Sequence, residues 1–357
     1  MLIDHHCHGV ARDPLDRTGF ESFLTESDRP PPRGCTAFDS LLGVAMRSMC
    51  GPVLELPAGA DPEDYVARRA DLGGEEANRR LLAGAGLEAM LVDSGLAGGA
   101  LLGIDDLGRL SGASAREVVR LEVVAEEVAA TGVGATEFES AFGELLSRRV
   151  GGAVGVKSII AYRHGLDFGA GRPSSPEVAS AAGRWLSGGG GRLDDEVLLR
   201  HVLWEGLATG LPLQLHTGFG DPDLDLARSD PALLTAFLRA CADVGTPVVL
   251  LHCYPYHRNA AYLANVFPHV YLDVGLAIPH VGRRAAAILA EALELAPFHK
   301  LLYSSDAYGL AELYMVAAVL FREALGEVLE ALRIGGSERA RIAAMIGSGN
   351  ARRLYAL

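Results

Sequence analysis

Short apolar segments alternate with amphipathic segments along most of this chain of 357 residues. Apolar runs such as "EAMLVD", "LPLQLH", "PVVLLH" and "KLLYSSD" are continuous, which is typical of parallel strands buried on both faces. Amphipathic stretches such as "DDEVLLRHVLWEGLATG" lie between them and predict helices. With the N-terminal segment "MLIDHHCH", the alternation gives roughly eight βα units, so we expect an α/β fold of the (β/α)8 TIM-barrel type.

Two segments depart from this alternation. Residues 10–86 contain "RPPPRG", "AFDSLLGVAMRSM" and "PEDYVARRADL", which predict a mostly helical insertion after the first strand, over the mouth of the barrel. Residues 173–192 contain "PSSP" and "SGGGGR", which predict a flexible loop after the fourth strand. We expect residues 1–357 to form a single domain around one barrel.

Three histidines stand close together in the first predicted strand, "LIDHHCHG". Successive strand residues point to opposite faces, so Asp4, His6 and His8 should share one face, and His5 and Cys7 the other. Two imidazoles at positions i and i+2 of an inward face can bind one metal ion. Because a histidine-rich terminus with no role would look the same, this pair alone does not establish a metal site.

Further metal-binding side chains end later strands. His216 ends "LPLQLH", His252 ends "PVVLLH" and Asp306 ends "KLLYSSD". Barrel enzymes carry their catalytic groups at the carboxyl ends of the strands. Together with His6 and His8, these residues offer four imidazoles and a carboxylate around one mouth, a ligand set suited to zinc or a similar divalent ion.

The composition narrows the choice of partner. The net charge of −13 argues against nucleic acid or an anionic membrane, and no apolar run approaches the length that spans a bilayer. The five cysteines are odd in number and scattered, which predicts free thiols in a reducing compartment such as the cytoplasm. We expect a small-molecule substrate, and a homo-oligomer is compatible with the sequence.

As a set, these motifs resemble the amidohydrolase superfamily, and in particular its amidohydrolase-related ("amidohydrolase 2") branch. The resemblance rests on "DHHCH", "HTGFGD", "HCYPY", "SSDAYG" and the terminal "GSGNARRLYAL". "VKSIIAYRHGLD" and "LDVGLA" are similar to the subgroup that includes the domain fused to glutamine synthetase in some fungal and plant proteins. The resemblance implies a metal-dependent hydrolase built on a TIM barrel.

The resemblance also implies a role for each motif residue. His6, His8 and Asp306 would hold a metal ion that acidifies a bound water. Asp306 would take the proton of that water and pass it to the leaving amine. His216 would be a further ligand, and His252 would either bind a second metal ion or polarise the substrate carbonyl.

Lys157 is one of only two lysines in the chain, the other being Lys300. It lies in the fourth predicted strand, where binuclear members of the superfamily carry a lysine carbamylated by carbon dioxide. The resemblance therefore implies that a carbamate on Lys157 bridges two metal ions. The alternative is a neutral lysine, or one paired with Asp4 or Glu122, as some relatives with one metal ion lack the bridge. Glu122 is a weaker candidate for the bridge itself.

Arg163, just past the fourth strand, is a candidate clamp for a substrate carboxylate at the mouth. A salt bridge to an acidic loop is its alternative role. Tyr162, His257 and His280 are further candidates for lining the pocket, although such residues are more often found at the surface or in packing. Asp273 in "YLDVG" is expected to fix the structure near the site.

Three functions are compatible with these features. The first is hydrolysis of a C–N bond in a small carboxylate-bearing amide, such as a γ-glutamyl amide. The second is non-oxidative decarboxylation of an aromatic or unsaturated acid on the same site, with one metal ion. The third is a non-catalytic binding role, which the complete ligand set argues against. Two metal ions bound per chain would favour hydrolysis.

Overall fold

Parallel strands follow one another around the molecule in chain order. The computed structural model describes residues 1–96 and 100–357, and within them seven strands form one parallel sheet in the order β1 to β7. Their bounds are β1 Leu2–Cys7, β2 Leu87–Asp93, β3 Ser114–Arg120, β4 Gly155–Ser158, β5 Leu213–Thr217, β6 Val248–His252 and β7 Val270–Leu272. Most strand residues are buried, and β5 and β6 are buried along their whole length, as expected for strands covered on both faces.

An eighth segment closes the ring between β7 and β1. On one side, the N–H of Leu302 donates to the carbonyl O of Leu272 in β7 at 3.0 Å. On the other side, the N–H of His5 in β1 donates to the carbonyl O of Tyr303 at 3.1 Å. Residues 301–306 thus complete the barrel without forming the regular ladder of a strand. The predicted (β/α)8 TIM-type fold is confirmed.

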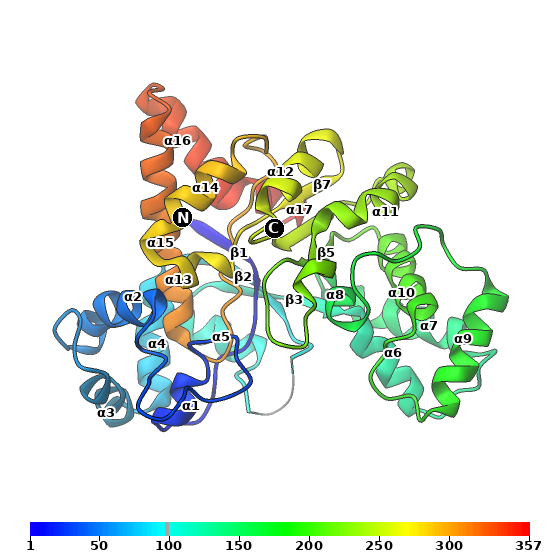
Figure 1. Ribbon diagram of the computed structural model, residues 1–357, viewed down its shortest axis with the longest axis horizontal. Helices are drawn as coiled ribbons and strands as arrows, with labels where there is room; N and C mark the ends of the chain where they lie inside the picture. Colours follow the sequence, from blue (N-terminus) through cyan, green and yellow to red (C-terminus); the bar gives the residue numbers. More distant parts are fainter. Residues whose placement is uncertain (97–99) are drawn as a thin grey trace.

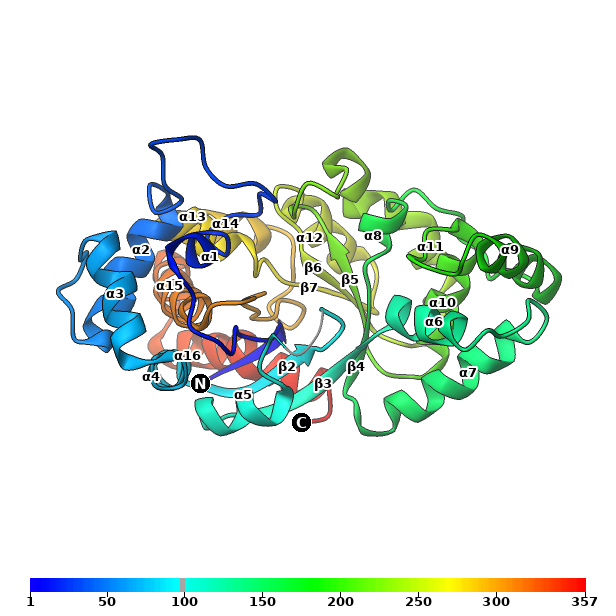
Figure 2. The same cartoon turned by 90° about the horizontal axis from the view of Figure 1, so that it is seen from below.

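Helices surround the strands and gather at both ends of the long axis of the molecule (Figure 1). The helices α1 to α4 lie with α15 at one end, and α6, α7, α9 and α10 gather at the other (Figure 2). The helix bounds are α1 Arg17–Glu21, α2 Leu41–Cys50, α3 Pro62–Leu72, α4 Gly74–Ala85, α5 Ile104–Ser111, α6 Leu121–Ala130, α7 Phe138–Arg149, α8 Ile160–Arg163, α9 Ser175–Ser187, α10 Glu196–Ala208, α11 Thr235–Ala240, α12 His257–Val266, α13 Ala277–Val281, α14 Ala285–Ala292, α15 Ala311–Ala331, α16 Gly336–Ala344 and α17 Asn350–Leu354. None of the described helices is both long and apolar enough to cross a lipid bilayer.

The first strand does not alternate its side chains as expected. The pairing of β1 with β2 shifts register between Asp4 and Cys7. Such an irregularity turns the side chains that follow it. His5 hydrogen-bonds the carboxylate of Asp273, which follows β7, and His6 hydrogen-bonds the side-chain amide of Gln214 in β5. Both histidines therefore point into the barrel. The prediction that His5 and His6 occupy opposite faces is therefore wrong.

The barrel interior holds its own small hydrophobic cluster. Side chains from β1, β2, β3, β6 and the eighth segment form it, together with Ala351 and Tyr355 from the C-terminal end of the chain. Tyr355 lies against Gly155, the first residue of β4, where an added Cβ would be 3.2 Å from its ring. The C-terminal segment therefore closes the end of the barrel opposite to the carboxyl ends of the strands.

Residues 10–86 are mostly helical, as predicted, and contain α1 to α4. The ring of Phe23, just after α1, meets the ring of Tyr308 with centroids 5.3 Å apart. Glu26 Oε1 lies 3.3 Å from Nε2 of His280 in α13. Because Tyr308 and His280 follow the eighth segment and β7, the segment after α1 lies at the mouth of the barrel. The helix α4 packs instead beside α15 (Figure 2).

Residues 173–192 do not form the predicted flexible loop, because Ser175–Ser187 is helix α9. A capping box begins this helix: both the N–H and the hydroxyl of Ser174 donate to Glu177, at 2.8 and 2.7 Å. Pro176 in the first turn adds a preset backbone angle. The sequence "SSPE" carried this signal, and the glycine-rich stretch after the helix obscured it.

A buried ion pair joins the insertion to the barrel. Arg69 of α3 donates from Nε to Oε1 of Glu312 in α15 at 2.8 Å, and both side chains are almost fully buried. Arg69 also donates from Nη2 to Asn78 at 2.7 Å, and the hydroxyl of Tyr65 donates to Glu312 at 3.3 Å. This network fixes α3 and α4 against α15.

We expect Arg69→Met to lower the free energy of unfolding by about 3–5 kcal/mol, because the change leaves Glu312 buried without its countercharge. Chemical denaturation followed by circular dichroism measures this loss. Arg79→Met is the control, since it removes an exposed ion pair with Glu76 and should have a much smaller effect. Equal losses in the two variants would contradict the role given to the buried pair.

Candidate metal centre

Side chains from the two ends of the chain meet at the mouth of the barrel. Nε2 of His6 lies 3.1 Å from Oδ1 of Asp306, and Nε2 of His8 lies 3.2 Å from the same oxygen. The ligand atoms of these residues all lie within 4.8 Å of one another. The N–H of Asp306 donates to the carbonyl O of His6 at 3.1 Å, so backbone pairing of the eighth segment with β1 fixes the cluster.

Hydrogen bonds fix the tautomers of both histidines. Nδ1 of His6 lies 2.9 Å from Oε1 of Gln214, and Nδ1 of His8 lies 3.1 Å from the carbonyl O of Asp93. Both partners are acceptors, so each Nδ1 carries the proton and each Nε2 is left with a free lone pair. An outer acceptor on the second ring nitrogen is the usual arrangement for a metal-binding histidine.

Two further histidines face the cluster. Nε2 of His252 lies 3.4 Å from Oδ2 of Asp306, and the rings of His216 and His252 have centroids 4.7 Å apart. Both side chains are buried, and among the described residues neither nitrogen of His252 nor Nε2 of His216 has a partner. Buried polar atoms without partners are costly, so a ligand that satisfies them is expected here.

Burial favours the neutral form of His6, His216 and His252. It lowers the pKa of His6 to about 3, with the charge of Lys157 as the second cause, and it lowers the pKa values of His216 and His252 as well. Burial opposes ionisation of Asp306, yet the neighbouring His252 helps to hold its pKa well below the usual range. Neutral imidazoles and an ionised carboxylate are the forms in which these side chains bind a metal ion.

The residues present therefore fit a divalent cation. The lone pairs on Nε2 of His6 and His8 point toward Oδ1 of Asp306, which has no donor among the described residues. Three acceptor atoms so close together repel one another unless a cation lies between them. Nitrogen and carboxylate donors in this combination suit zinc and similar transition metals.

Lys157 reaches the cluster from β4. Its Nζ lies 3.0 Å from Nε2 of His6 and 4.0 Å from Oδ2 of Asp93. Burial is the main cause that lowers the pKa of Lys157 to about 8. The two partners expected in the alternative interpretation bond elsewhere: Asp4 accepts two hydrogen bonds from Ser305, and Glu122 accepts the hydroxyl of Ser158 and the next backbone N–H.

Tyr162 and His280 lie at the rim of the site. The rings of Tyr162 and His216 have centroids 4.5 Å apart. Gly220 makes this approach feasible, because a Cβ there would collide with the hydroxyl of Tyr162 and lie 3.2 Å from Nε2 of His216. His280 pairs with Glu26 of the insertion. Both predicted residues are thus brought close to the mouth.

Arg163 and His257 make their polar contacts elsewhere. Arg163, in α8, pairs through Nη1 with Oε1 of Glu126 at 2.9 Å. His257, at the start of α12, bonds through Nε2 to Glu291 of α14 at 2.7 Å. The structure therefore does not bring these two residues to the histidine cluster, and Arg163 takes the ion-pair role that was its alternative.

Several residues around the site were missed in the sequence. Gln214 and Asp93 orient His6 and His8, and Arg120 donates from Nη2 to Asp93 at 2.6 Å. Each is a polar residue within or at the carboxyl end of an apolar strand, in "LQLH", "LVD" and "VVR". That signal was available, because a polar side chain facing a barrel interior needs a partner there.

The expected structural role of Asp273 is confirmed. Its Oδ2 accepts a hydrogen bond from Nε2 of His5 at 2.9 Å, and its Oδ1 accepts the backbone N–H of His252 at 2.9 Å. The other nitrogen of His5 lies 3.1 Å from the hydroxyl of Tyr355, which in turn accepts the side-chain N–H of Gln214 at 2.8 Å. A continuous hydrogen-bond network therefore lies beneath the cluster.

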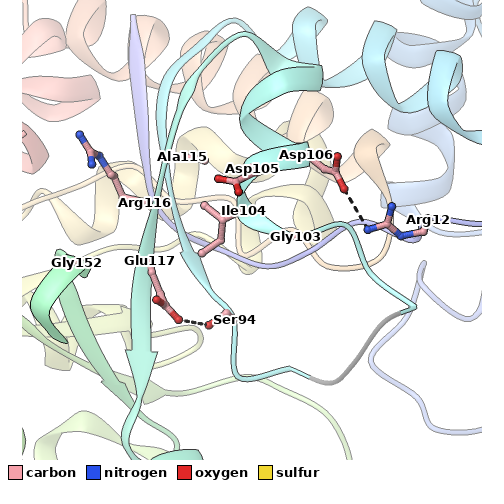
Figure 3. Close-up of a pocket in the computed structure, with 10 residues that line it drawn as sticks. All are labelled: Arg12, Ser94, Gly103, Ile104, Asp105, Asp106, Ala115, Arg116, Glu117 and Gly152. Atoms are coloured by element: carbon pink, nitrogen blue, oxygen red, sulfur yellow. Dashed lines mark hydrogen bonds and ion pairs between the residues drawn. The ribbon is translucent and has the colours of Figure 1, made fainter. Parts of the chain in front are cut away.

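A cavity of about 740 Å³ lies apart from the histidines, between β3 and the start of α5. Figure 3 shows Asp106 bonded to Arg12 and Glu117 bonded to Ser94 along its walls, with Arg116 on the strand. None of the predicted site residues lines it. Arg12 and Asp106 form an ion pair at its wall, and its lining offers no group comparable to the cluster at the mouth.

Known proteins share sequence and fold with this chain. The sequence model of the amidohydrolase family, Amidohydro_2, matches residues 128–357. Protein fluG of Emericella nidulans is 38% identical over 193 residues, which cover 49% of this chain and 22% of that protein. The chain thus spans less than a quarter of the length of this relative.

Solved structures share the fold along the whole chain. A Lactobacillus casei protein provisionally named a metal-dependent hydrolase is 30% identical, with a TM-score of 0.89 over 99% of this chain and 95% of that one. A uronate isomerase of Bacillus halodurans is 14% identical, with a TM-score of 0.67 over 99% of this chain and 93% of that one. At that identity the second likeness concerns the fold alone.

We expect the purified protein to carry a divalent transition metal, and His6→Ala and Asp306→Ala each to lose most of it, since each removes one of the convergent ligand atoms. Elemental analysis by plasma emission measures metal per chain. His257→Ala is the matched control, because it removes a buried histidine that bonds Glu291 instead, and it should retain the metal. Protein that is metal-free without chelator treatment and cannot be reloaded would refute the site.

Proposed function

Because this chain belongs to the amidohydrolase family, and its metal-dependent hydrolase fold carries a convergent histidine–carboxylate cluster, we propose that it hydrolyses a C–N bond in a small amide. The observation that carries the proposal is the meeting of His6, His8 and Asp306 in a buried, acceptor-only cluster. We propose further that the amide bears a carboxylate, as a γ-glutamyl amide does.

In this proposal His6, His8 and Asp306 hold the metal ion, with His216 as a further ligand. A divalent ion bound there acidifies a water ligand toward neutral pH. Zinc is the ion that this donor set suits best. Gln214 and the carbonyl of Asp93 keep the two Nε2 atoms aimed at the site by holding the opposite ring nitrogens.

In the same proposal, Asp306 transfers the proton and His252 binds the substrate carbonyl. Oδ1 of Asp306 lies with His6 and His8, whereas Oδ2 faces His252. We assign Oδ2 as the proton carrier, which takes a proton from the attacking water and gives it to the departing amine nitrogen. His252 is buried, neutral and without a partner among the described residues, so it is available to hydrogen-bond the substrate carbonyl.

Lys157 determines how many metal ions the proposal requires. Its amine is buried beside Nε2 of His6, and with a pKa of about 8 a useful fraction is neutral near neutral pH. A neutral amine can add to carbon dioxide, release a proton and become a carbamate whose two oxygens would bridge two metal ions. Without that reaction, the ammonium competes with the metal ion for the lone pair of His6.

We expect Lys157→Ala to lower the metal content by one ion per chain if the carbamate forms, with partial recovery when a short carboxylic acid is added. Plasma emission counts the ions, and intact-mass measurement under carbon dioxide detects the added carboxyl group. If the wild type and Lys157→Ala each bind one metal ion, and Lys157 of the wild type is unmodified, the bridge is excluded. The one-metal site then remains in place.

Aromatic rings beside the histidines favour one alternative reaction. Tyr162 lies against His216, and the rings of Tyr308 and His8 have centroids 6.2 Å apart. Rings on both sides of the cluster suit a planar acid, which a non-oxidative decarboxylase would accept. In that reaction the same ligands would bind the metal ion and carbon dioxide would leave.

The two reactions give different products, so a substrate screen distinguishes them. We expect the metal-loaded protein to release amine from γ-glutamyl anilides and related ω-amides, and Asp306→Asn to reduce turnover by about a hundredfold or more because it removes the proton carrier. Ammonia, aniline and carbon dioxide release are measured in parallel. Carbon dioxide from an aromatic acid, with no amide cleaved, would transfer the assignment to the decarboxylase.

A further inference from the structure

Arg120 is the last residue of β3 and stands at the carboxyl end of the barrel. It pairs in register with Lys157 of β4. Register partners in neighbouring parallel strands point to the same side of a sheet, and the amine of Lys157 points at His6 inside the barrel. Arg120 therefore also directs its guanidinium inward, and it is largely buried.

Asp93 occupies only one edge of this guanidinium. Both Nε and Nη2 of Arg120 donate to Oδ2 of Asp93, at 3.1 and 2.6 Å. The other oxygen of Asp93 accepts the backbone N–H of Gly95 at 2.9 Å. Among the described residues, the edge formed by Nη1 and the second N–H of Nη2 has no partner. A guanidinium has five donors in a fixed fork, so this second edge can bind another carboxylate through two bonds.

Gly95 holds the side chain in this orientation. A Cβ at Gly95 would lie 2.5 Å from Cβ and 2.7 Å from Cδ of Arg120, so the backbone after β2 packs directly on the stem of the arginine. The stem is confined and the pair with Asp93 fixes the plane of the guanidinium. A donor fork held in place in this way loses little rotamer freedom when it binds an anion.

The fork is also next to the candidate metal centre. Oδ2 of Asp93, which accepts from Arg120, lies 4.0 Å from Nζ of Lys157, and Nζ lies 3.0 Å from Nε2 of His6. Burial opposes the charge of Arg120, but Asp93 first, and then Glu122 and Asp306, raise its pKa. Arg120 therefore remains positively charged, and its charge interacts with that of the Asp306 carboxylate.

From these contacts we propose that the free edge of Arg120 binds the carboxylate of the substrate, so that the protein selects amides whose acyl portion ends in a second carboxylate. This inference rests on the proposed function. It gives to Arg120 the recognition that the sequence had suggested for Arg163, whose guanidinium pairs with Glu126. The substrate class is the ω-amides of short dicarboxylic acids, held by Arg120 at one end with the amide carbonyl near Asp306 and His252.

The test measures binding of glutarate, and of neutral glutaramide as its matched probe, to the protein as purified by isothermal titration calorimetry. We expect glutarate to bind, and Arg120→Gln to weaken its binding by about ten- to a hundredfold, as loss of a charge-assisted two-bond contact predicts. Glutaramide binding should change little. Arg116→Gln is the control on the same strand, because Arg116 is exposed and lies four residues before Arg120, toward the amino end of β3, and this variant should bind glutarate like the wild type.

Arg120→Lys keeps the charge without the fork and should weaken glutarate binding to an intermediate degree, which also gives a readout if Arg120→Gln does not fold. Equal affinity for glutarate in the wild type and both Arg120 variants would overturn the inference, as would a wild type that does not bind glutarate at millimolar concentration. These readouts need no turnover. A protein that binds glutarate through Arg120 but cleaves no amide would refute the proposed reaction and keep Arg120 as the residue that binds the carboxylate of the substrate.

Discussion

The carboxylate of Asp306 is the group around which the polar interior of this barrel is arranged. Its two oxygens face three imidazoles, from His6 in β1, His8 just after β1 and His252 in β6, and its own backbone N–H pairs with β1. A largely buried ionised group is tolerated only when its surroundings compensate its charge. Gln214, Asp93 and Asp273 provide the outer contacts that hold the imidazoles in place.

Strand ends were the most informative part of the sequence. The apolar runs predicted the barrel, and the placement of His216, His252 and Asp306 at their carboxyl ends predicted residues that do converge. Both predictions depend on local pattern alone, because in a parallel barrel every carboxyl end faces the same mouth. Asp273 belongs to the same group, and its contacts follow from its place after β7.

The sequence pattern could not predict features that depend on the exact strand register or on contacts between distant side chains. A shift within β1 turns both His5 and His6 inward, and no periodicity in "DHHCH" reports it. Arg163 sits one helical turn past β4 and meets Glu126 of α6, whereas Arg120, the last residue of β3, points into the barrel. Which arginine faces the barrel interior depends on tertiary contacts, which a single sequence does not encode locally.

The hydroxyl of Tyr355 touches both Gln214 and His5, so groups 350 positions apart in the chain share one hydrogen-bond network. During synthesis, the histidines of β1 leave the ribosome long before Asp306 and longer still before Tyr355. A nascent chain therefore displays an imidazole pair with neither its carboxylate nor the support beneath it. Contacts of such long sequence separation form late in folding. Selective uptake of an ion should accordingly be a property of the finished chain, and the growing chain should hold metals loosely and with little discrimination.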